Sequence, residues 1–315
     1  HLTVSRAAAN LGVSWHTANT AILEEGRRLL IDDPHRFDGV TTIGVDEHVW
    51  RHTRHGDKYV TVIIDLTPVR NKRGPARLLD MVEGRSKKVF SAWLAARTQA
   101  WRDGIQVVAM DGFTGFKTAS KEHLPDATEV MDPFHVVQLA GDALDRTRQR
   151  VQQETLGHRG RANDPLYGVR RVLRTGEAFL TDKQQARLDQ VFADPRHADV
   201  WRAWRAYQQV VAAYREKFSG LGRKRLRELI DLLKSTTPAW FTELRKLAYT
   251  LDRRRADILA YFDHPRTSNG PTEAINGRLE HLRGSALGFR NLAHYIARSL
   301  LEAGGFRARL HPEFR

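Results

Sequence analysis

The sequence contains no cysteine, and this absence removes whole classes of protein from consideration. Without thiols the chain has neither disulfides nor cysteine-ligated zinc, which fits a reducing compartment. Long apolar runs are missing as well, since no stretch approaches the ~18 uncharged residues that a membrane-spanning helix needs. Residues 1–30 have helical patterns instead of the short apolar core of a signal peptide. We therefore expect a cytoplasmic protein without a membrane partner.

Acidic residues are scarce relative to basic ones. Lys and Arg number 51, and Asp and Glu number 37, so the formal net charge is +14. Arginine suits bidentate contact with phosphates, and a basic excess favours polyanionic partners because each phosphate contact releases counterions. Arginine-rich codon usage in a high-GC genome would raise the charge in the same way. We favour a nucleic-acid partner over that compositional explanation.

Residues 1–33 predict a helix, a turn and a second helix. An alanine-rich helix precedes Gly12, which favours a turn, and Ser14 is placed to cap the helix that follows. This pattern is typical of a helix-turn-helix DNA-binding segment, although an ordinary helical hairpin has the same outline. In the DNA-binding interpretation, polar residues early in the second helix face the major groove: Trp15, His16, Thr17 and Asn19. The first helix of the usual three is not evident, so we expect a partial, truncated module.

Residues 40–150 alternate between strand-like and helical segments. We predict strands at 41–50, 58–66, 76–82, 105–110 and 127–131, and helices at 86–101, 116–123 and from 133 to about 153. Three strands followed by alternating helices and strands indicate a mixed α/β sheet. This is the element order of a ribonuclease-H-like fold.

Residues 151–264 have a wholly helical pattern and predict a long insertion. The segment exceeds the length of any connection inside a compact domain. Aromatic residues recur in it at helical spacing, either as a core stripe, which we favour, or as a surface that stacks on bases: Trp201, Trp204, Tyr207 and Tyr214. Residues 265–315 return to the α/β core, with helices predicted at 272–282 and 291–303.

Three acidic residues occupy particular places in this element order. Asp46 lies within the first strand, and Asp111 directly follows the fourth. These strands are neighbours in a ribonuclease-H-like sheet, so their carboxylates should face each other. Glu273 opens a late helix that would pack beside them. Each acid alone has an ordinary structural explanation, such as a turn or a helix-dipole contact, but their joint placement favours a shared site.

Three converging carboxylates repel one another unless cations lie between them. Mg²⁺ is the expected cofactor, with Mn²⁺ able to replace it, because both ions prefer carboxylate oxygens and retain several waters. Two such ions about 4 Å apart can hold the attacking and leaving oxygens of an in-line phosphoryl displacement. The three acids therefore predict a metal-dependent enzyme acting on phosphodiester bonds.

Four segments carry a resemblance to a known family: IGVDE at 43–47, VAMDGF at 108–113, DPFH at 132–135 and TSNGPTEAING at 267–277. Together they resemble the bacterial DDE transposases of the ISL3 insertion-sequence family, from about residue 40 to 305. The resemblance implies a catalytic, metal-binding triad of Asp46, Asp111 and Glu273, with a helical insertion between the last two. It also implies dependence on Mg²⁺.

The same resemblance implies DNA strand cleavage and strand transfer at the ends of an insertion sequence. The expected partners are double-stranded DNA with terminal inverted repeats, target DNA, and further copies of the chain as a homo-oligomer in the DNA complex. The protein would then act at the bacterial nucleoid. Two alternatives stay open: a ribonuclease-H-like nuclease or resolvase that only hydrolyses DNA, and a non-catalytic, domesticated DNA-binding protein.

The segment at 132–135 resembles the D-x-x-H motif of transposases that carry such insertions. On this basis His135 is a fourth catalytic candidate, placed in the first turn of a helix near the sheet edge that carries Asp111. Asp132 is a good N-cap residue, and that role explains it without a function. Family members commonly carry a cysteine-rich zinc module upstream, and none occurs here. Because the chain begins at His1, we expect truncation.

Other charged residues offer competing assignments. Glu280, seven residues after Glu273 on the same helix face, is the main rival for the third acid. Glu47 and Asp65 are expected to be solvated or paired with arginine. His48, His52 and His55 have a metal-like density, although their arginine-rich surroundings disfavour zinc. Arginines of the late helices are expected to contact the DNA backbone: Arg278, Arg283 and Arg290.

Overall fold

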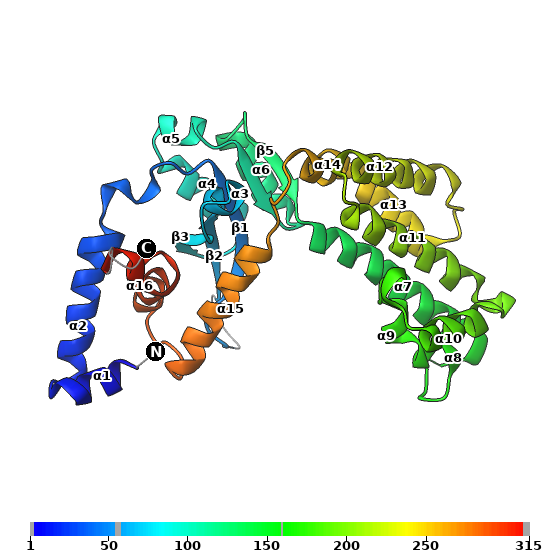
Figure 1. Cartoon of the computed structure of the whole chain (residues 1–315), viewed down its shortest axis with the longest axis horizontal. Coiled ribbons are helices and arrows are strands. Elements are labelled where there is room, and N and C mark those ends of the chain that lie inside the picture. The colour runs from blue at the N-terminus through cyan, green and yellow to red at the C-terminus, as the bar shows by residue number, and fades with distance from the viewer. Residues whose placement is uncertain (1–2, 54–57, 159, 311–315) are drawn as a thin grey trace. The chain divides into compact units, whose positions relative to one another are not determined.

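The chain divides into two compact units in the computed structural model, which describes residues 3–53, 58–158 and 160–310. The first unit consists of His1–Val130 together with Arg266–Arg315, and the second of Met131–Pro265. Figure 1 shows the first unit in blue to cyan and orange to red, and the second in green to yellow. A long helical segment is thus inserted between two parts of one folded unit.

The described part of the first unit contains a five-stranded sheet in the order β3-β2-β1-β4-β5. β1 pairs antiparallel with β2 and parallel with β4, and β2 pairs antiparallel with β3. This mixed sheet confirms the predicted fold class, because its order matches a ribonuclease-H-like sheet. Every strand begins within two residues of its predicted start: β1 Thr42–Val49, β2 Tyr59–Asp65, β3 Arg77–Glu83, β4 Val107–Met110 and β5 Thr128–Met131.

Each face of the sheet is covered by a different pair of helices. On one face, Ile43 and Val45 of β1 pack with α4 (Lys87–Ala95) and α6 (Thr114–His123). On the other, Val60 and Val62 of β2 pack with α15 (Gly270–Ser285) and α16 (Leu292–Ala303). Successive residues of a strand point to opposite faces. Gly44 and Asp46 of β1 therefore belong to the face that α15 and α16 cover.

The single helix predicted at 86–101 is wrong, because two helices occupy this segment. α4 ends before Ala96, and α5 spans Gln99–Asp103. The Thr98 side chain accepts a hydrogen bond from the backbone N–H of Trp101 at 3.2 Å, so it caps a new helix. The redirected chain packs the Trp101 ring edge-on against Trp93, with 5.6 Å between ring centroids. A tertiary contact thus decides where the helical pattern breaks.

The N-terminal segment folds as a helical pair within the first unit. α1 (Val4–Leu11) and α2 (Trp15–Gly26) are joined by Gly12, whose positive φ of 65° suits a residue without a side chain. Ser14 caps α2 as predicted, accepting a hydrogen bond from the Thr17 N–H at 3.0 Å. α2 ends at Gly26, and a π-helical turn continues the helical segment to Ile31. Leu23 packs with Leu301 of α16, which anchors the pair.

The second unit is helical throughout its described regular structure. It begins at Met131, and α7, which packs along α11, continues without a break past residue 151, the predicted start of the insertion. Of the aromatic stripe, Trp204 and Tyr207 are buried in this core, and Trp201 is 45% exposed. The longer helices are α7 Pro133–Leu156, α10 Asp182–Phe192, α11 Ala198–Arg215, α12 Ser219–Thr236, α13 Thr242–Arg253 and α14 Arg255–Asp263.

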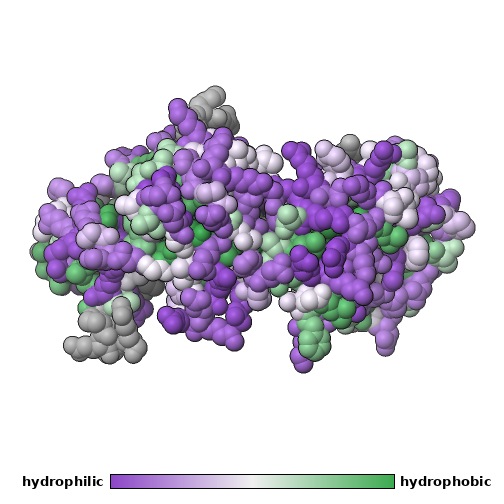
Figure 2. Space-filling model, turned by 90° about the horizontal axis from the view of Figure 1, so that it is seen from above, coloured by the Kyte–Doolittle hydropathy of each residue, from purple (hydrophilic) through white to green (hydrophobic). Residues whose placement is uncertain are grey.

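The surface agrees with the charged composition. Hydrophilic residues predominate on the face drawn in Figure 2, with smaller hydrophobic areas among them. Among the helices in the described ranges, none has the length and apolar character that crossing a membrane requires.

Candidate active site

Asp46 lies in β1, the central strand of the sheet, and Asp111 directly follows β4, the parallel neighbour of β1. β1 and β4 run parallel with Val45 opposite Met110, and each acid is the next residue along its strand direction. One step earlier, Gly44 is opposite Ala109, which packs on the α15 face of the sheet. Alternation of side chains directs Asp46, and Asp111 just past the end of β4, toward that same face. The predicted pairing of these strands is confirmed.

α15 lies close against β1, and glycine makes this approach possible. A Cβ atom at Gly44 would lie 2.8 Å from Oγ1 of Thr272 and 3.1 Å from a methyl carbon of Leu66. Thr272 itself is fully buried. A side chain at Gly44 would therefore push the helix away, so glycine in mid-strand is required by packing. The start of α15 is held directly over the strand that carries Asp46.

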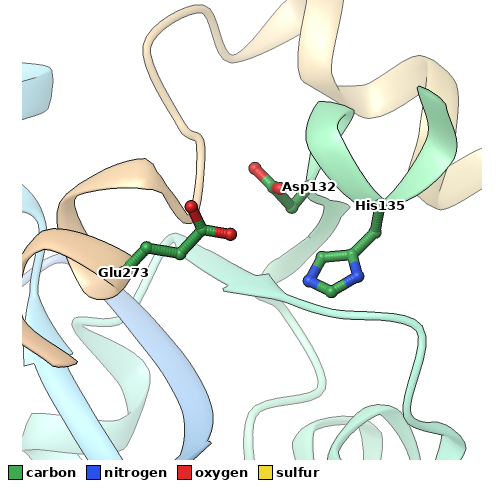
Figure 3. Close-up of side chains that lie close together, drawn as sticks. All are labelled: Asp132, His135 and Glu273. Atoms are coloured by element: carbon green, nitrogen blue, oxygen red, sulfur yellow. The ribbon is translucent and has the colours of Figure 1, made fainter. Parts of the chain in front are cut away.

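A hydrogen bond joins this helix to the first acid. The Asn276 amide Nδ2 donates to Oδ2 of Asp46 at 3.1 Å. Glu273 lies three residues earlier, in the first turn of α15, and therefore on the same side of the helix as Asn276. Figure 3 draws its side chain at this position. The chain thus presents an acid on the helical stripe that faces Asp46, although 162 residues separate Glu273 from Asp111 in sequence.

Backbone donors orient both aspartates. Oδ1 of Asp46 accepts the N–H of Glu47 at 2.8 Å, and Oδ1 of Asp111 accepts the N–H of Phe113 at 2.8 Å. An ionised carboxylate has about four lone-pair sites. Each carboxylate is therefore oriented by a fixed backbone donor, and carboxylate oxygens are the ligands that a hard cation prefers. An all-oxygen donor set of this kind matches Mg²⁺ or Mn²⁺.

Asp132 caps α7 and is buried. Its side chain accepts the N–H of Phe134 at 3.1 Å, and the residue is only 1% exposed. Burial raises the pKa values of Tyr214 and Tyr261, and the nearby Asp132 carboxylate raises both further. The capping role predicted for Asp132 is confirmed. His135, in the first turn of the helix, is partly exposed (Figure 3).

Glu280, the rival for the third acid, is engaged elsewhere. The Arg283 guanidinium donates to Glu280 and also contacts Nε2 of His52 at 2.8 Å. Hydrogen bonding to Arg283 lowers the pKa of Glu280. His48 is buried and shares a 2.7 Å hydrogen bond with the hydroxyl of Tyr295, and burial lowers the pKa of His48 to about 4. These contacts assign structural roles to Glu280 and His48.

Several predicted contact residues are paired inside the chain. Arg278 forms an ion pair with Glu302 at 3.2 Å, and Arg283 is only 13% exposed in its pair with Glu280. The expected arginine partners of Glu47 and Asp65 are present, at 3.1 Å and 2.9 Å: Arg85 and Arg77. A zinc site that includes His55 falls outside the described residues.

The recognition residues of α2 divide into two groups. Trp15, His16 and Thr17 are exposed, as DNA contact requires. Asn19 is only 8% exposed. It follows the buried Ala18 on the inner side of the helix, so the prediction that it faces the major groove does not fit this conformation. Sequence position alone did not separate the inner from the outer residues of α2.

Two residues that shape the site were not predicted from the sequence. Asn276 lies in the segment at 267–277, and its spacing of three from Glu273 is the signal that places it on the same side of the helix. Gly44 lies two residues before Asp46, and a glycine inside an apolar strand is a signal of close backbone approach.

Comparisons with known proteins point to one class. Residues 43–299 match the family model of a transposase. The transposase for insertion sequence element IS1557 of Mycobacterium tuberculosis, in strains CDC 1551 / Oshkosh and ATCC 25618 / H37Rv, is 27% identical over 330 residues. That match covers 96% of this chain and 69% of the relative. The transposase for IS1001 of Bordetella parapertussis is 28% identical over 197 residues, 60% of this chain and 43% of the relative.

Proposed function

Because the chain belongs to the ISL3 family of DDE transposases, we propose that it cleaves DNA strands at insertion-sequence ends and transfers them to target DNA. One observation carries the proposal beyond family membership. Asp46 and Asp111 each directly follow the last paired residues of two parallel strands, Val45 and Met110, and α15, which bears Glu273, is hydrogen-bonded to Asp46. In the proposed site, carboxylates from three distant parts of the chain would meet at one region of the sheet.

In this proposal Asp46, Asp111 and Glu273 hold Mg²⁺, or Mn²⁺ in its place. Bound metal would stabilise charge on the attacking and leaving oxygens of an in-line displacement at phosphorus. The protein orients these ligands. The backbone N–H groups of Glu47 and Phe113 hold Asp46 and Asp111, respectively. The side-chain amide of Asn276 also holds Asp46. No covalent protein nucleophile is needed. Hydrolysis frees a 3′ hydroxyl, which then attacks a target phosphate.

His135 is proposed as a fourth member of the site. α7 begins directly after β5 ends, so its first turn follows the carboxyl end of a sheet strand. An imidazole there can contact a phosphate or orient a reacting group. The D-x-x-H resemblance supports this role.

The remaining segments have proposed DNA roles. Residues 1–33 act as a partial helix-turn-helix, with Trp15, His16 and Thr17 as exposed contact residues. Residues 40–150 and 265–315 form the catalytic core, and 151–264 the insertion. Arg290 is exposed and available to a phosphate, whereas Arg278 and Arg283 would have to exchange an acidic partner first. Copies of the chain would assemble on paired DNA ends.

The test is an assay for strand cleavage and joining. Duplex DNA carrying the element's terminal repeats is incubated with the protein and Mg²⁺, and nicked and joined products are resolved on a denaturing gel. Asp46→Asn, Asp111→Asn and Glu273→Gln should each reduce both products by more than about 100-fold, because losing a ligand exceeds the 10–100-fold cost of losing a ligand's supporting contact. All three should still bind DNA in EDTA.

Glu280→Gln is the matched control, since it removes a carboxylate from the same helix. It should cut at nearly the wild-type rate. Triad variants that cut like wild type would refute the assignment of the acids. Nicks without joined products would favour a nuclease, and binding without any cleavage would favour a non-catalytic DNA-binding protein.

A further inference from the structure

The loop between α15 and α16 contains a leucine that has both an exposed side chain and a left-handed backbone conformation. Leu287 is 97% exposed, the highest value among the exposed large hydrophobic residues of the described chain. Its φ is +54°, in the left-handed region that side-chain-bearing residues rarely adopt. Exposure of an apolar side chain and left-handed backbone are both unfavourable for a leucine. Folding alone gives no reason to place one here.

The backbone around Leu287 is held in place. The Ala286 N–H donates to the Leu282 carbonyl at 3.1 Å, the Leu287 N–H to Gly284 at 3.0 Å, and the Gly288 N–H to Arg283 at 2.9 Å. These bonds form the end of α15, where glycine or asparagine usually takes the left-handed position. The side chain therefore projects from a fixed turn. Non-glycine residues kept in such conformations concentrate at functional sites.

Basic residues lie around this turn. Residues 281–301 contain three arginines and two histidines, and the glutamates that flank this segment, Glu280 and Glu302, are paired with Arg283 and Arg278. Arg290, three residues after Leu287, is exposed. An apolar tip among basic residues is complementary to duplex DNA, whose phosphates flank stacked, apolar base faces.

We propose that Leu287 is an apolar wedge that inserts between adjacent base pairs of duplex DNA. The identity of the DNA as substrate rests on the proposed function above, whereas the wedge is carried by the geometry of this turn. Leucine is among the side chains that proteins insert at base steps, where it unstacks the bases and kinks the duplex. The fixed turn means that no ordering of the loop is needed when the side chain enters.

The length of α15 also sets the distance between the wedge and Glu273. From Glu273 to Ser285, 285 − 273 = 12 residues of α15 extend ~18 Å at the rise of an α-helix. That length corresponds to about five base pairs of duplex DNA at 3.4 Å each. The wedge would thus distort DNA several base pairs from the phosphate that Glu273 serves, so distortion and cleavage can be measured separately.

Unwinding of closed-circular plasmid tests the wedge without a known recognition sequence. The protein is bound to relaxed plasmid in EDTA, a metal-independent topoisomerase relaxes the complex, and the topoisomers are resolved after deproteinisation. Wild type should lower the linking number in proportion to bound protein, because an inserted side chain unwinds the helix. Leu287→Gly and Leu287→Ala should lose most of this change at equal occupancy, as measured by filter binding. Leu232→Ala, at a half-exposed leucine of α12, is the matched control and should unwind like wild type.

Thermal unfolding separates this role from a structural one. Leu287→Gly relieves the left-handed strain and should raise Tm by about 1–3 °C while unwinding is lost. A variant that is both more stable and defective in unwinding cannot be explained by misfolding. Equal unwinding by wild type and Leu287→Gly, or none by wild type at saturation, would overturn the wedge. If the plasmid is unwound but end-bearing DNA is never cut with Mg²⁺, the wedge stands and the proposed function fails.

Discussion

At the scale of single residues, one amide determines how Asp46 presents its carboxylate. Asn276 donates to Oδ2 while the Glu47 backbone donates to Oδ1, so both oxygens are held. The Asn276 Oδ1 is buried and has no hydrogen-bond partner among the described residues. A buried amide with one unsatisfied end costs free energy. Its retention beside a candidate metal ligand is consistent with a role in orienting that ligand.

Replacing Asn276 should therefore weaken metal use more than folding. In Asn276→Ala the carboxylate of Asp46 loses its side-chain donor, and the loss of such a supporting contact typically costs 10–100-fold in metal affinity or activity. We expect the Mg²⁺ concentration for half-maximal strand cleavage to rise about tenfold. Binding of Mn²⁺, followed by its electron paramagnetic resonance signal, should weaken in parallel.

The control for this change is Asn163→Ala, which alters an exposed asparagine of the second unit. It should leave the metal dependence unchanged. An Asn276→Ala protein with wild-type metal dependence, and only a lower Tm, would reduce Asn276 to a packing residue.

At the scale of elements, the packing of α15 and α2 determines which side chains of each helix are available for function. α15 approaches β1 because Gly44 leaves room for Thr272, and this approach aligns Glu273 and Asn276 with the strand. α2 packs inward through Leu23 and keeps Trp15 and His16 in solvent. In both helices, one side is buried by packing against the sheet or another helix. The residues on the remaining sides are available to contact metal or DNA.

Two substitutions in α2 should have opposite consequences. His16→Ala removes an exposed group and should reduce the preference for specific over random DNA by about tenfold, since one base contact contributes roughly 1–3 kcal/mol. Its Tm should not change. Asn19→Ala alters a buried residue and should lower Tm while the sequence preference stays. Competition gel shifts and thermal melts measure both. Loss of preference in Asn19→Ala with unchanged Tm would restore Asn19 as a base-reading residue.

At the scale of the whole molecule, the formal charge of +14 predicts how DNA affinity responds to salt. Many arginines are neutralised in ion pairs, such as Arg150 with Glu243 and Arg174 with Asp145, yet basic residues exceed acidic ones overall. With about six phosphate contacts, affinity should fall about 10³-fold between 50 and 200 mM salt. Fluorescence anisotropy over this range gives the slope. A flat response would mean that the charge does not serve DNA binding.

Local sequence predicted the strands well for a physical reason. Apolar runs such as those in β2 and β4 arise because strands buried on both faces need them, and neighbouring residues alone encode this pattern. The same local information fails at the 86–101 segment, where Thr98 and the packing of Trp101 break the helix. Local patterns indicate which residues can be helical. Tertiary contacts decide where a helix stops.

The sequence by itself determined the fold class, the order of the elements, and the motifs that contain Asp46, Asp111 and Glu273, because these depend on short-range periodicity and residue chemistry. Only the tertiary structure decided which side of each element is buried and what meets there. It placed Asn276 against Asp46 across 230 residues, buried Asn19, and left Leu287 projecting from a strained turn. Such contacts join residues at no fixed spacing, since they depend on how distant surfaces fit together.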